Sequence, residues 1–194
     1  MDKDVRPYKQ KESTCAIACL MMILEYYKQI PKADWNYEKQ YYKAYRSKYM
    51  DGTPFSAIAY HLVKNNFEVE LIHSDKNLFH NNNEIADYIF NGAIEEYKQY
   101  LEDAKKYGLK IRTGIDLNHR MLKQYLEKGK MIILALEFGT CLHAILLTGY
   151  EEDSFIVCDP QYKQKQKMTF TEIADFMNTS LGKWCIVVGP NELE

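Results

Sequence analysis

The feature that most constrains this fold is an uninterrupted apolar run at residues 15–24, which reads CAIACLMMIL. Ser13 and Thr14 precede it, and hydroxyl side chains favour the position just before a helix. A helix that is apolar on every side has no face to turn toward water, so it belongs inside the fold. A bilayer-spanning helix needs about 20 apolar residues. The run therefore predicts a helix at the centre of a globular core, with Cys15 in its first turn.

The rest of the chain is consistent with one domain. A chain of 194 residues can bury one sizeable core, so we predict a single domain over residues 1–194. Residues 1–10 are charged and contain no apolar stretch typical of a secretory signal, and no other run is long enough to cross a membrane. We therefore expect a cytoplasmic protein without a membrane segment. The net charge of −2 comes from well-mixed signs, which gives no reason to expect a nucleic-acid partner.

The chain has five cysteines, an odd number, whereas small secreted domains usually have an even number paired in disulfide bonds. Each is therefore a core residue, a metal ligand or a nucleophile. Cys19 lies one turn deeper than Cys15 on the same helix face and is predicted to be core. A zinc site from Cys141, His143 and Cys158, with or without Cys15, is an alternative, but there is no Cys-x-x-Cys pair. We expect no metal and no other cofactor.

The amino-terminal half is predicted to be mainly helical. A second helical segment falls within residues 33–49, which are rich in Tyr and Lys, and a third helix opens at Pro54 and runs to residue 63. Residues 67–72 alternate between apolar and polar and predict a strand. Residues 74–108 are polar, with a helical pattern that runs from Ile85 to Leu101, and are interpreted as a helical insertion.

The carboxyl-terminal half predicts an antiparallel sheet. A helix capped by Asp116 and ending at Lys128 and Gly129 leads into a buried strand at residues 131–136. Further strands are expected at 142–150 and 155–158, joined by the charged turn 151–153, and at 184–188 after a short helix at 171–177. Helices first and strands afterwards indicate an α+β layout, with the central buried helix packed on the sheet.

Cys15 is the candidate nucleophile. A thiol becomes reactive when its pKa falls, and a helix N-terminus and a nearby imidazolium both lower it. The unpaired amide groups of the first turn would point toward its sulfur and could stabilise a developing oxyanion. Most free cysteines are simply buried apolar residues, so the assignment needs further residues to support it.

His143 and Asp159 are the candidate partners. His143 lies at the start of an otherwise apolar strand, and Asp159 follows the next strand. If the turn between these strands centres on Glu152, Ile145 pairs with Asp159, and His143 becomes a diagonal neighbour of Asp159 on the same face. A shift of one residue would put them on opposite faces. The aspartate would then hold the imidazole in the tautomer that faces a thiol.

The remaining histidines, at positions 61, 73, 80 and 119, lie in polar or helical surroundings and are predicted to be surface residues. The 16 tyrosines are dense between residues 26 and 60. We expect them to pack or to line a groove rather than to bind a cofactor.

Four segments together resemble one family. They are Gln10, residues 13–24, residues 142–150 and residues 158–160, in this order along the chain. The combination resembles the bacteriocin-processing, double-glycine-leader cysteine peptidases and their stand-alone relatives, a branch of the papain-like superfamily. The resemblance covers the chain outside residues 74–108. It departs at Ala16, where many relatives have glycine.

The resemblance implies a papain-like fold and a cysteine peptidase. It implies that Gln10 donates its side-chain amide to an oxyanion hole, Cys15 attacks, His143 moves the proton and Asp159 orients the histidine. The substrate would be a peptide or a related amide, with leader removal from a ribosomally made peptide as one possibility. The resemblance is also compatible with a transporter or a modifying enzyme as a partner protein.

Two other functions remain open. A papain-like acyltransferase would use the same three residues and pass the acyl group to an amine, and water exclusion, not sequence, would decide between them. A non-catalytic domain that grips a peptide, with residues 74–108 as the gripping surface, is the second alternative.

Overall fold

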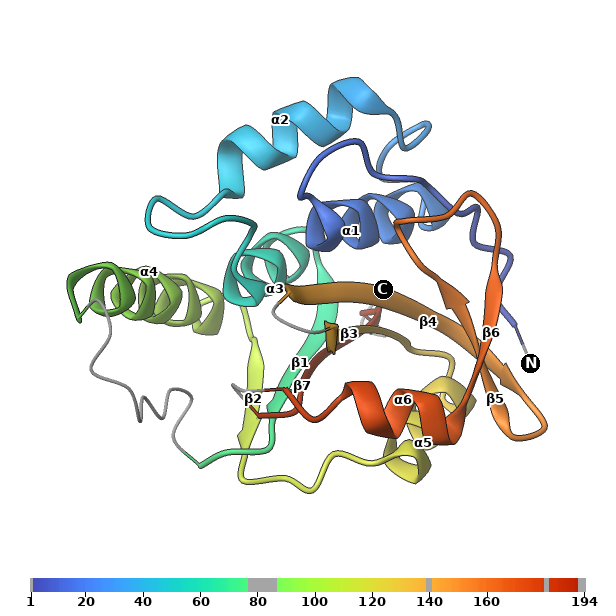
Figure 1. Ribbon diagram of the computed structural model, residues 1–194. Coiled ribbons are helices and arrows are strands. Elements are labelled where there is room, and N and C mark those ends of the chain that lie inside the picture. Colours follow the sequence, from blue (N-terminus) through green and yellow to red (C-terminus); the bar gives the residue numbers. More distant parts are fainter. Residues whose placement is uncertain (1, 77–86, 139–140, 180–181, 192–194) are drawn as a thin grey trace.

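The computed structural model describes residues 2–76, 87–138, 141–179 and 182–191 (Figure 1). Within them, seven strands form one sheet in the order β2-β1-β7-β3-β4-β5-β6. The strands are β1 (Phe67–His73), β2 (Lys110–Thr113), β3 (Met131–Phe138), β4 (Cys141–Glu151), β5 (Ser154–Cys158), β6 (Gln166–Thr169) and β7 (Trp184–Pro190). The helices are α1 (Cys15–Tyr26), α2 (Trp35–Tyr45), α3 (Phe55–Lys64), α4 (Asp87–Lys105), α5 (His119–Glu127) and α6 (Phe170–Phe176).

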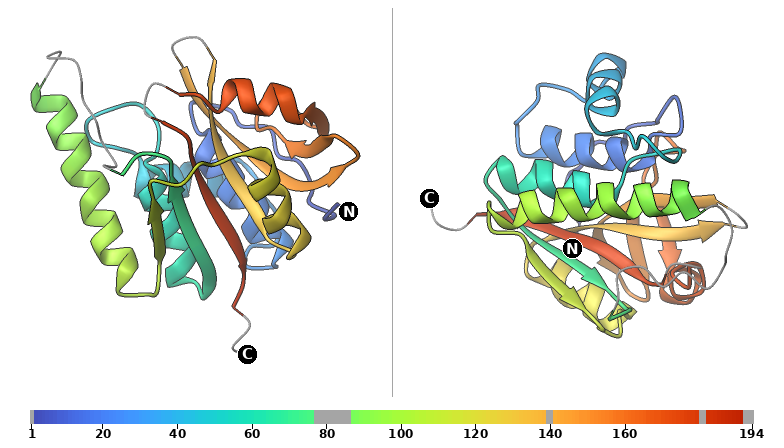
Figure 2. Two further views of the ribbon diagram at one scale, coloured as in Figure 1. Left: turned by 90° about the horizontal axis from the view of Figure 1, so that it is seen from below. Right: turned by 90° about the vertical axis from the view of Figure 1, so that its left-hand side faces the viewer.

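Helices cover both faces of the sheet. Helices α1, α3 and α4 lie on one face with α2 outside α1, and α5 and α6 lie on the other (Figure 2). Residues of β3 alternate between the two layers: Ile133 joins the core under α1, whereas Ile132 and Leu134 join the core under α5 and α6. A strand buried on both faces needs an unbroken apolar sequence, which is why residues 131–136 lack alternation. The predicted α+β fold class is confirmed.

Helix α1 is the predicted central helix. Residues 16–24 are all buried and Cys15 is half-buried. Thr14 is the N-cap residue, but its hydroxyl bonds the Glu38 carboxylate and the Glu12 carbonyl and makes no hydrogen bond to a first-turn amide. The first amide groups of α1 therefore have no side-chain cap.

A fully buried carboxylate on α2 holds the segment that leads into α1. Glu38 accepts hydrogen bonds from the Tyr8 hydroxyl, the Thr14 hydroxyl and, at 3.0 Å, the Lys11 backbone amide. Three donors satisfy a charge that water cannot reach. Residues 8–14 are thereby fixed against α2.

The amino-terminal segment is also tied to the β4–β5 hairpin. The Lys3 amide donates to the Thr148 carbonyl at 3.1 Å, and the Gln10 amide donates to the Pro160 carbonyl at 2.8 Å. The Thr148 hydroxyl donates to the Asp2 carboxylate at 2.9 Å. The segment that precedes α1 is therefore hydrogen-bonded to the hairpin and to the residues that follow it.

Several predicted boundaries shift, and two strands were not predicted. Pro54 is the N-cap of α3 rather than its first residue. The short strands β2 and β6 carry no apolar alternation, and β2 pairs parallel to β1, so the sheet is not wholly antiparallel. Strand β1, from the first half of the chain, joins this same sheet beside β7. In the expected insertion, α4 is the helix, and residues 77–86 lie outside the described residues.

The prediction that Asp116 caps α5 was wrong. The cap is Asn118, whose side-chain oxygen accepts a hydrogen bond from the Met121 amide at 3.1 Å. We expect Asn118→Ala to lower the free energy of unfolding by about 1 kcal/mol, because a first-turn amide loses its acceptor. Asp116→Ala should change it by less than about 0.5 kcal/mol, as exposed substitutions usually do. Urea denaturation of both variants checks this, and equal effects would contradict it.

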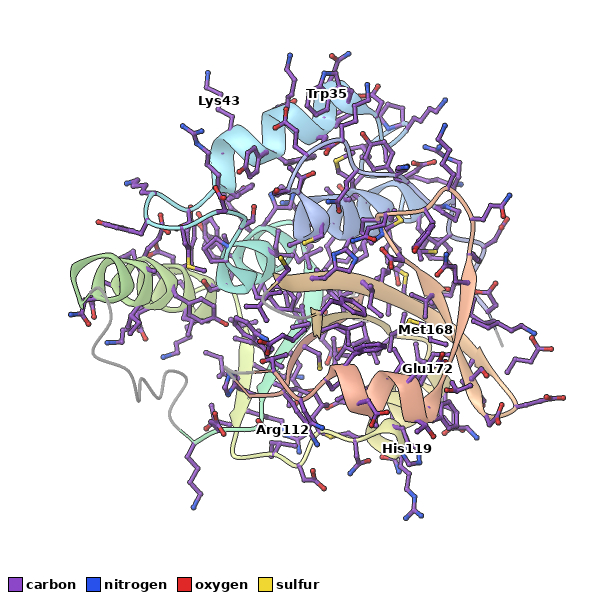
Figure 3. All side chains as sticks on the ribbon, in the orientation of Figure 1. Trp35, Lys43, Arg112, His119, Met168 and Glu172 are labelled. Atoms are coloured by element: carbon purple, nitrogen blue, oxygen red, sulfur yellow. The ribbon has the colours of Figure 1, made fainter. Side chains whose placement is uncertain are left out.

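The prediction that the other histidines are surface residues was wrong for His73 and His61. His73 is buried, and its Nδ1 accepts a hydrogen bond from the Asp75 amide. His61 is half-buried beside Tyr45, and burial lowers its pKa to about 4. The ring of His119, labelled in Figure 3, stacks on Phe170 at 5.3 Å. His80 lies outside the described residues.

In the described part of the chain, none of the helices combines the length and the apolar character that a bilayer crossing requires.

Candidate active site

The β4–β5 hairpin sets the relative positions of His143 and Asp159. Its turn is formed by Glu152 and Asp153, so Glu151 pairs with Ser154, one residue away from the predicted register. Continued regularly, this ladder would place His143 and Asp159 on opposite faces.

A β-bulge between Leu147 and Gly149 shifts the pairing by one residue. Beyond it, Leu147 pairs with Val157 and Leu146 with Cys158. This is the register that puts His143 and Asp159 on the same face. The predicted pairing at this end of the hairpin is therefore present, although the predicted position of the turn was wrong.

His143 and Asp159 form a direct hydrogen bond. His143 Nε2 lies 2.8 Å from Asp159 Oδ1, and both residues are buried, at 7% and 8% exposure. The Gln161 backbone amide donates to the same carboxylate oxygen at 2.8 Å, which fixes its orientation. The bond to Asp159 occupies Nε2, so Nδ1 is the ring nitrogen left for another partner.

That partner is the Cys15 thiol. Burial raises the pKa of Cys15, but the hydrogen bond to His143, the charge of that ring and the backbone amides of Ala144 and Ala16 outweigh it, so the pKa is lowered. Burial lowers the pKa of His143, but the hydrogen bonds to Asp159 and Cys15 outweigh it and raise the pKa to about 9. The arrangement therefore favours a thiolate beside an imidazolium.

Gln10 is close to this group but is differently engaged. Its side-chain amide donates to the Glu12 carbonyl at 2.7 Å, and its side-chain oxygen is buried without a hydrogen-bond partner among the described residues. Its backbone bond to Pro160 places it beside the chain that follows Asp159. The structure thus brings Gln10 near the site, while its side-chain donor points to its own loop.

An apolar pocket of about 180 Å³ opens beside Cys15 and His143. Its walls come from the start of α1, from the loop before α3, and from α3, α4, β3, β4 and β7. The large apolar residues that line it are Met50, Phe55, Ile94, Tyr97, Leu142 and Trp184. Sequence reasoning did not identify them as site residues, since they belong to segments far apart in the chain.

The other cysteines lie elsewhere. Cys19, as predicted, is buried in the core, where its thiol donates to the Ala144 carbonyl at 3.6 Å. Cys158 and Cys185 are buried, and Cys141 is exposed. No group of three or more His, Cys, Asp or Glu side chains in the described ranges is arranged to hold a metal ion.

A second hollow lies between α2 and the segment before α1. Its lining includes Trp35, Glu38 and Lys43 but neither Cys15 nor His143. Figure 3 labels Trp35 and Lys43 on α2, at the edge of the molecule away from the sheet. It is therefore separate from the pocket beside Cys15.

Comparisons with known proteins agree with the fold and with the predicted family. The peptidase domain of Streptococcus ComA, a bifunctional ABC transporter of a quorum-sensing pathway, aligns over 96% of this chain and 98% of its own, with 16% identity and a TM-score of 0.50. A double-glycine-motif protease from an AMS/PCAT transporter, solved with its leader peptide, aligns over 97% and 94%, with 16% identity and a TM-score of 0.54.

No curated protein matched. The sequence model of the peptidase C39-like family matches residues 2–185, nearly the whole chain. The papain-like fold and the family that the sequence resembles are thereby confirmed. This chain belongs to the peptidase C39-like family.

Proposed function

We propose that this protein is a cysteine peptidase that cleaves a peptide bond through a thioester on Cys15. The observation that carries the proposal is the arrangement of three side chains: a half-buried thiol at a helix N-terminus, an imidazole in contact with it, and a carboxylate 2.8 Å from the far ring nitrogen. This is the order nucleophile, base and orienting group that covalent acyl transfer needs.

The proposed reaction has two halves. The Cys15 thiolate attacks the carbonyl carbon of the scissile bond, His143 gives its proton to the leaving amine, and the carbon–nitrogen bond breaks to leave a thioester. His143 then takes a proton from water, whose oxygen attacks the thioester carbon, and the carbon–sulfur bond breaks to release the carboxylic acid and the Cys15 thiolate beside the protonated His143. Asp159 keeps the imidazole aligned in both halves.

The oxyanion formed in each half needs donors. The first-turn amide groups of α1 have no side-chain cap, because the Thr14 hydroxyl is bonded to Glu38 and Glu12. These amides are the donors we propose. Gln10 joins them once its side-chain amide exchanges the Glu12 carbonyl for the substrate.

We further propose that the substrate is a peptide, as for the structural neighbour that was solved with a leader peptide. Removal of a leader from a ribosomally made peptide is the process we propose. The five cysteines are free thiols, which suits a reducing cytoplasmic setting.

The pH dependence of Cys15 alkylation tests the proposal. Because its pKa is lowered, Cys15 becomes a thiolate at a pH below its ordinary pKa of 9.0, while His143 stays protonated up to its own pKa of about 9. Iodoacetamide should therefore alkylate Cys15 at a lower pH than it alkylates a free cysteine. In His143→Ala the hydrogen bond and the charge of the ring are lost while burial remains, so the pKa of Cys15 rises and the alkylation rate at pH 7 should fall at least about 10-fold.

Mass spectrometry assigns the alkylated residue, and His119→Ala is the matched control because that ring stacks on Phe170, away from the thiol. The control should alkylate like the wild type. If wild-type Cys15 reacts only as a buried thiol does, the proposed chemistry is wrong and the binding-domain alternative takes its place.

A further inference from the structure

The pocket beside Cys15 has a rigid aromatic wall. The rings of Phe55 and Trp184 stack with centroids 5.1 Å apart, and the rings of Tyr97 and Trp184 lie 6.1 Å apart. All three residues are nearly buried, at 6%, 4% and 9% exposure for Phe55, Tyr97 and Trp184. Side chains packed on one another in this way cannot collapse into the space, so the pocket keeps its shape when empty.

Helix α4 closes the pocket from one side and is fixed to the neighbouring loop. Ala93, Ile94 and Tyr97 of α4 line the pocket, and residues 50–54 line it from the loop before α3. Glu96 accepts hydrogen bonds from the Ser47 hydroxyl at 2.6 Å and from the Lys48 amide at 3.2 Å.

Helix and loop also meet at a glycine. A Cβ atom at Gly92 would lie 2.3 Å from the Tyr49 ring, so only glycine allows this close approach. Helix α4 and the loop therefore form one wall.

We infer that this pocket binds one bulky apolar side chain of the substrate, within two residues of the scissile bond; the inference rests on the proposed peptidase function. A volume of about 180 Å³ is small for a whole ligand. It suffices for one aromatic or branched aliphatic side chain, because an apolar cavity of roughly 150 Å³ holds a benzene ring.

The position of the pocket connects it to the reacting bond. Cys15 and His143 themselves line it, so its occupant lies next to the attacked carbonyl. Leu142 and Met50 are apolar and exposed, at 38% and 53%, and belong to the same lining. Burial of an apolar side chain here covers surface that water otherwise contacts.

A glycine at this position would leave the pocket empty. One structural neighbour is a double-glycine-motif protease, and glycine carries no side chain. The pocket of this chain, bounded by α4 and Trp184, has room for a side chain. We therefore assign the preference for an apolar side chain to α4 and Trp184.

Two thiol reagents of different size test the inference on the intact protein. Iodoacetamide and N-benzyl iodoacetamide share one reacting group, and only the second carries a ring. The ratio of their alkylation rates at Cys15, divided by the same ratio for N-acetylcysteine, should be at least about 10. Mass spectrometry follows the site at pH 7.

Ile94→Trp fills the pocket and should bring this normalised ratio to about 1, because the ring of the second reagent then has no apolar space to enter. Asn91→Trp adds the same bulk at an exposed position of α4 and should keep the wild-type ratio. Ile94→Ala enlarges the space and should favour N-naphthylmethyl iodoacetamide over the benzyl reagent.

The outcomes separate the two proposals. Failure of iodoacetamide to react faster with Cys15 than with a free thiol overturns the peptidase function. A reactive Cys15 whose normalised ratio is near 1 overturns the apolar pocket alone. If Ile94→Trp keeps the wild-type normalised ratio and Ile94→Ala does not favour the naphthylmethyl reagent, α4 does not determine the preference for apolar side chains.

Discussion

Cys15→Ala is expected to reduce hydrolysis of any peptide that the protein cleaves by at least about 10⁴-fold, because the thioester has no other nucleophile to form on. The first-turn amides, His143 and Asp159 remain in this variant, so binding of the peptide should persist. Incubation with a peptide library and mass spectrometry of the products measures the loss. The alanine side chain fits the half-buried position, so the melting temperature should stay near that of the wild type.

Cys141→Ala is the matched control, since this thiol is exposed and lines no part of the pocket. It should cleave as the wild type does. Retention of cleavage in the Cys15 variant would rule out the thioester, and loss in both variants would point to a general effect of cysteine removal.

Glu38→Ala is expected to be the most destabilising of the substitutions considered. It leaves the Tyr8 hydroxyl, the Thr14 hydroxyl and the Lys11 amide without their buried acceptor. The Thr14 hydroxyl is buried and loses about 1–3 kcal/mol, whereas Tyr8 and Lys11 are more accessible to water and lose less, so the expected total with the loss of the buried carboxylate is roughly 3–5 kcal/mol. For a domain of this size that lowers the melting temperature by roughly 6–20 °C.

Calorimetry of Glu38→Ala beside Gln40→Ala measures the effect, because Gln40 is exposed on the same helix and should change stability by less than about 0.5 kcal/mol. Glu38→Gln keeps an acceptor and should fall between them. Equal melting temperatures for the two alanine variants would show that the segment 8–14 does not depend on this carboxylate.

The elements with strong periodicity could be predicted from the sequence. The run at residues 15–24 has only one stable place, the centre of the core, and α1 is there. The strands at 131–136 and 142–150 were equally clear, because strands buried on both faces are continuous apolar runs. His143 and Asp159 could be identified as candidates because each lies at an end of a predicted strand.

Local patterns do not encode the bulge. The pairing of His143 with Asp159 was reached from a turn centred on Glu152, whereas the turn lies at Glu152 and Asp153 and the bulge between Leu147 and Gly149 restores the register. A bulge depends on what packs around the strand, here Asp2 and Lys3 against Thr148. The shifted turn and the bulge each change the register by one residue, and the two changes cancel at His143 and Asp159.

Features assembled from distant segments were also out of reach. Glu38 is one glutamate on a helix rich in polar residues, and nothing near it in the sequence shows that three donors converge on it. The pocket draws on loop, helix and strand residues from position 13 to position 184. Such sites follow from tertiary packing, which single-sequence periodicity does not describe.

The ties between the amino-terminal segment and the β4–β5 hairpin have a consequence for the newly made chain. Cys15 emerges from the ribosome well before His143, which lowers its pKa. Until the hairpin closes on the segment before α1, the sulfur is an ordinary thiol. Its reactivity is therefore acquired only when contacts between the two ends of the chain have formed, and an incomplete chain carries no active nucleophile.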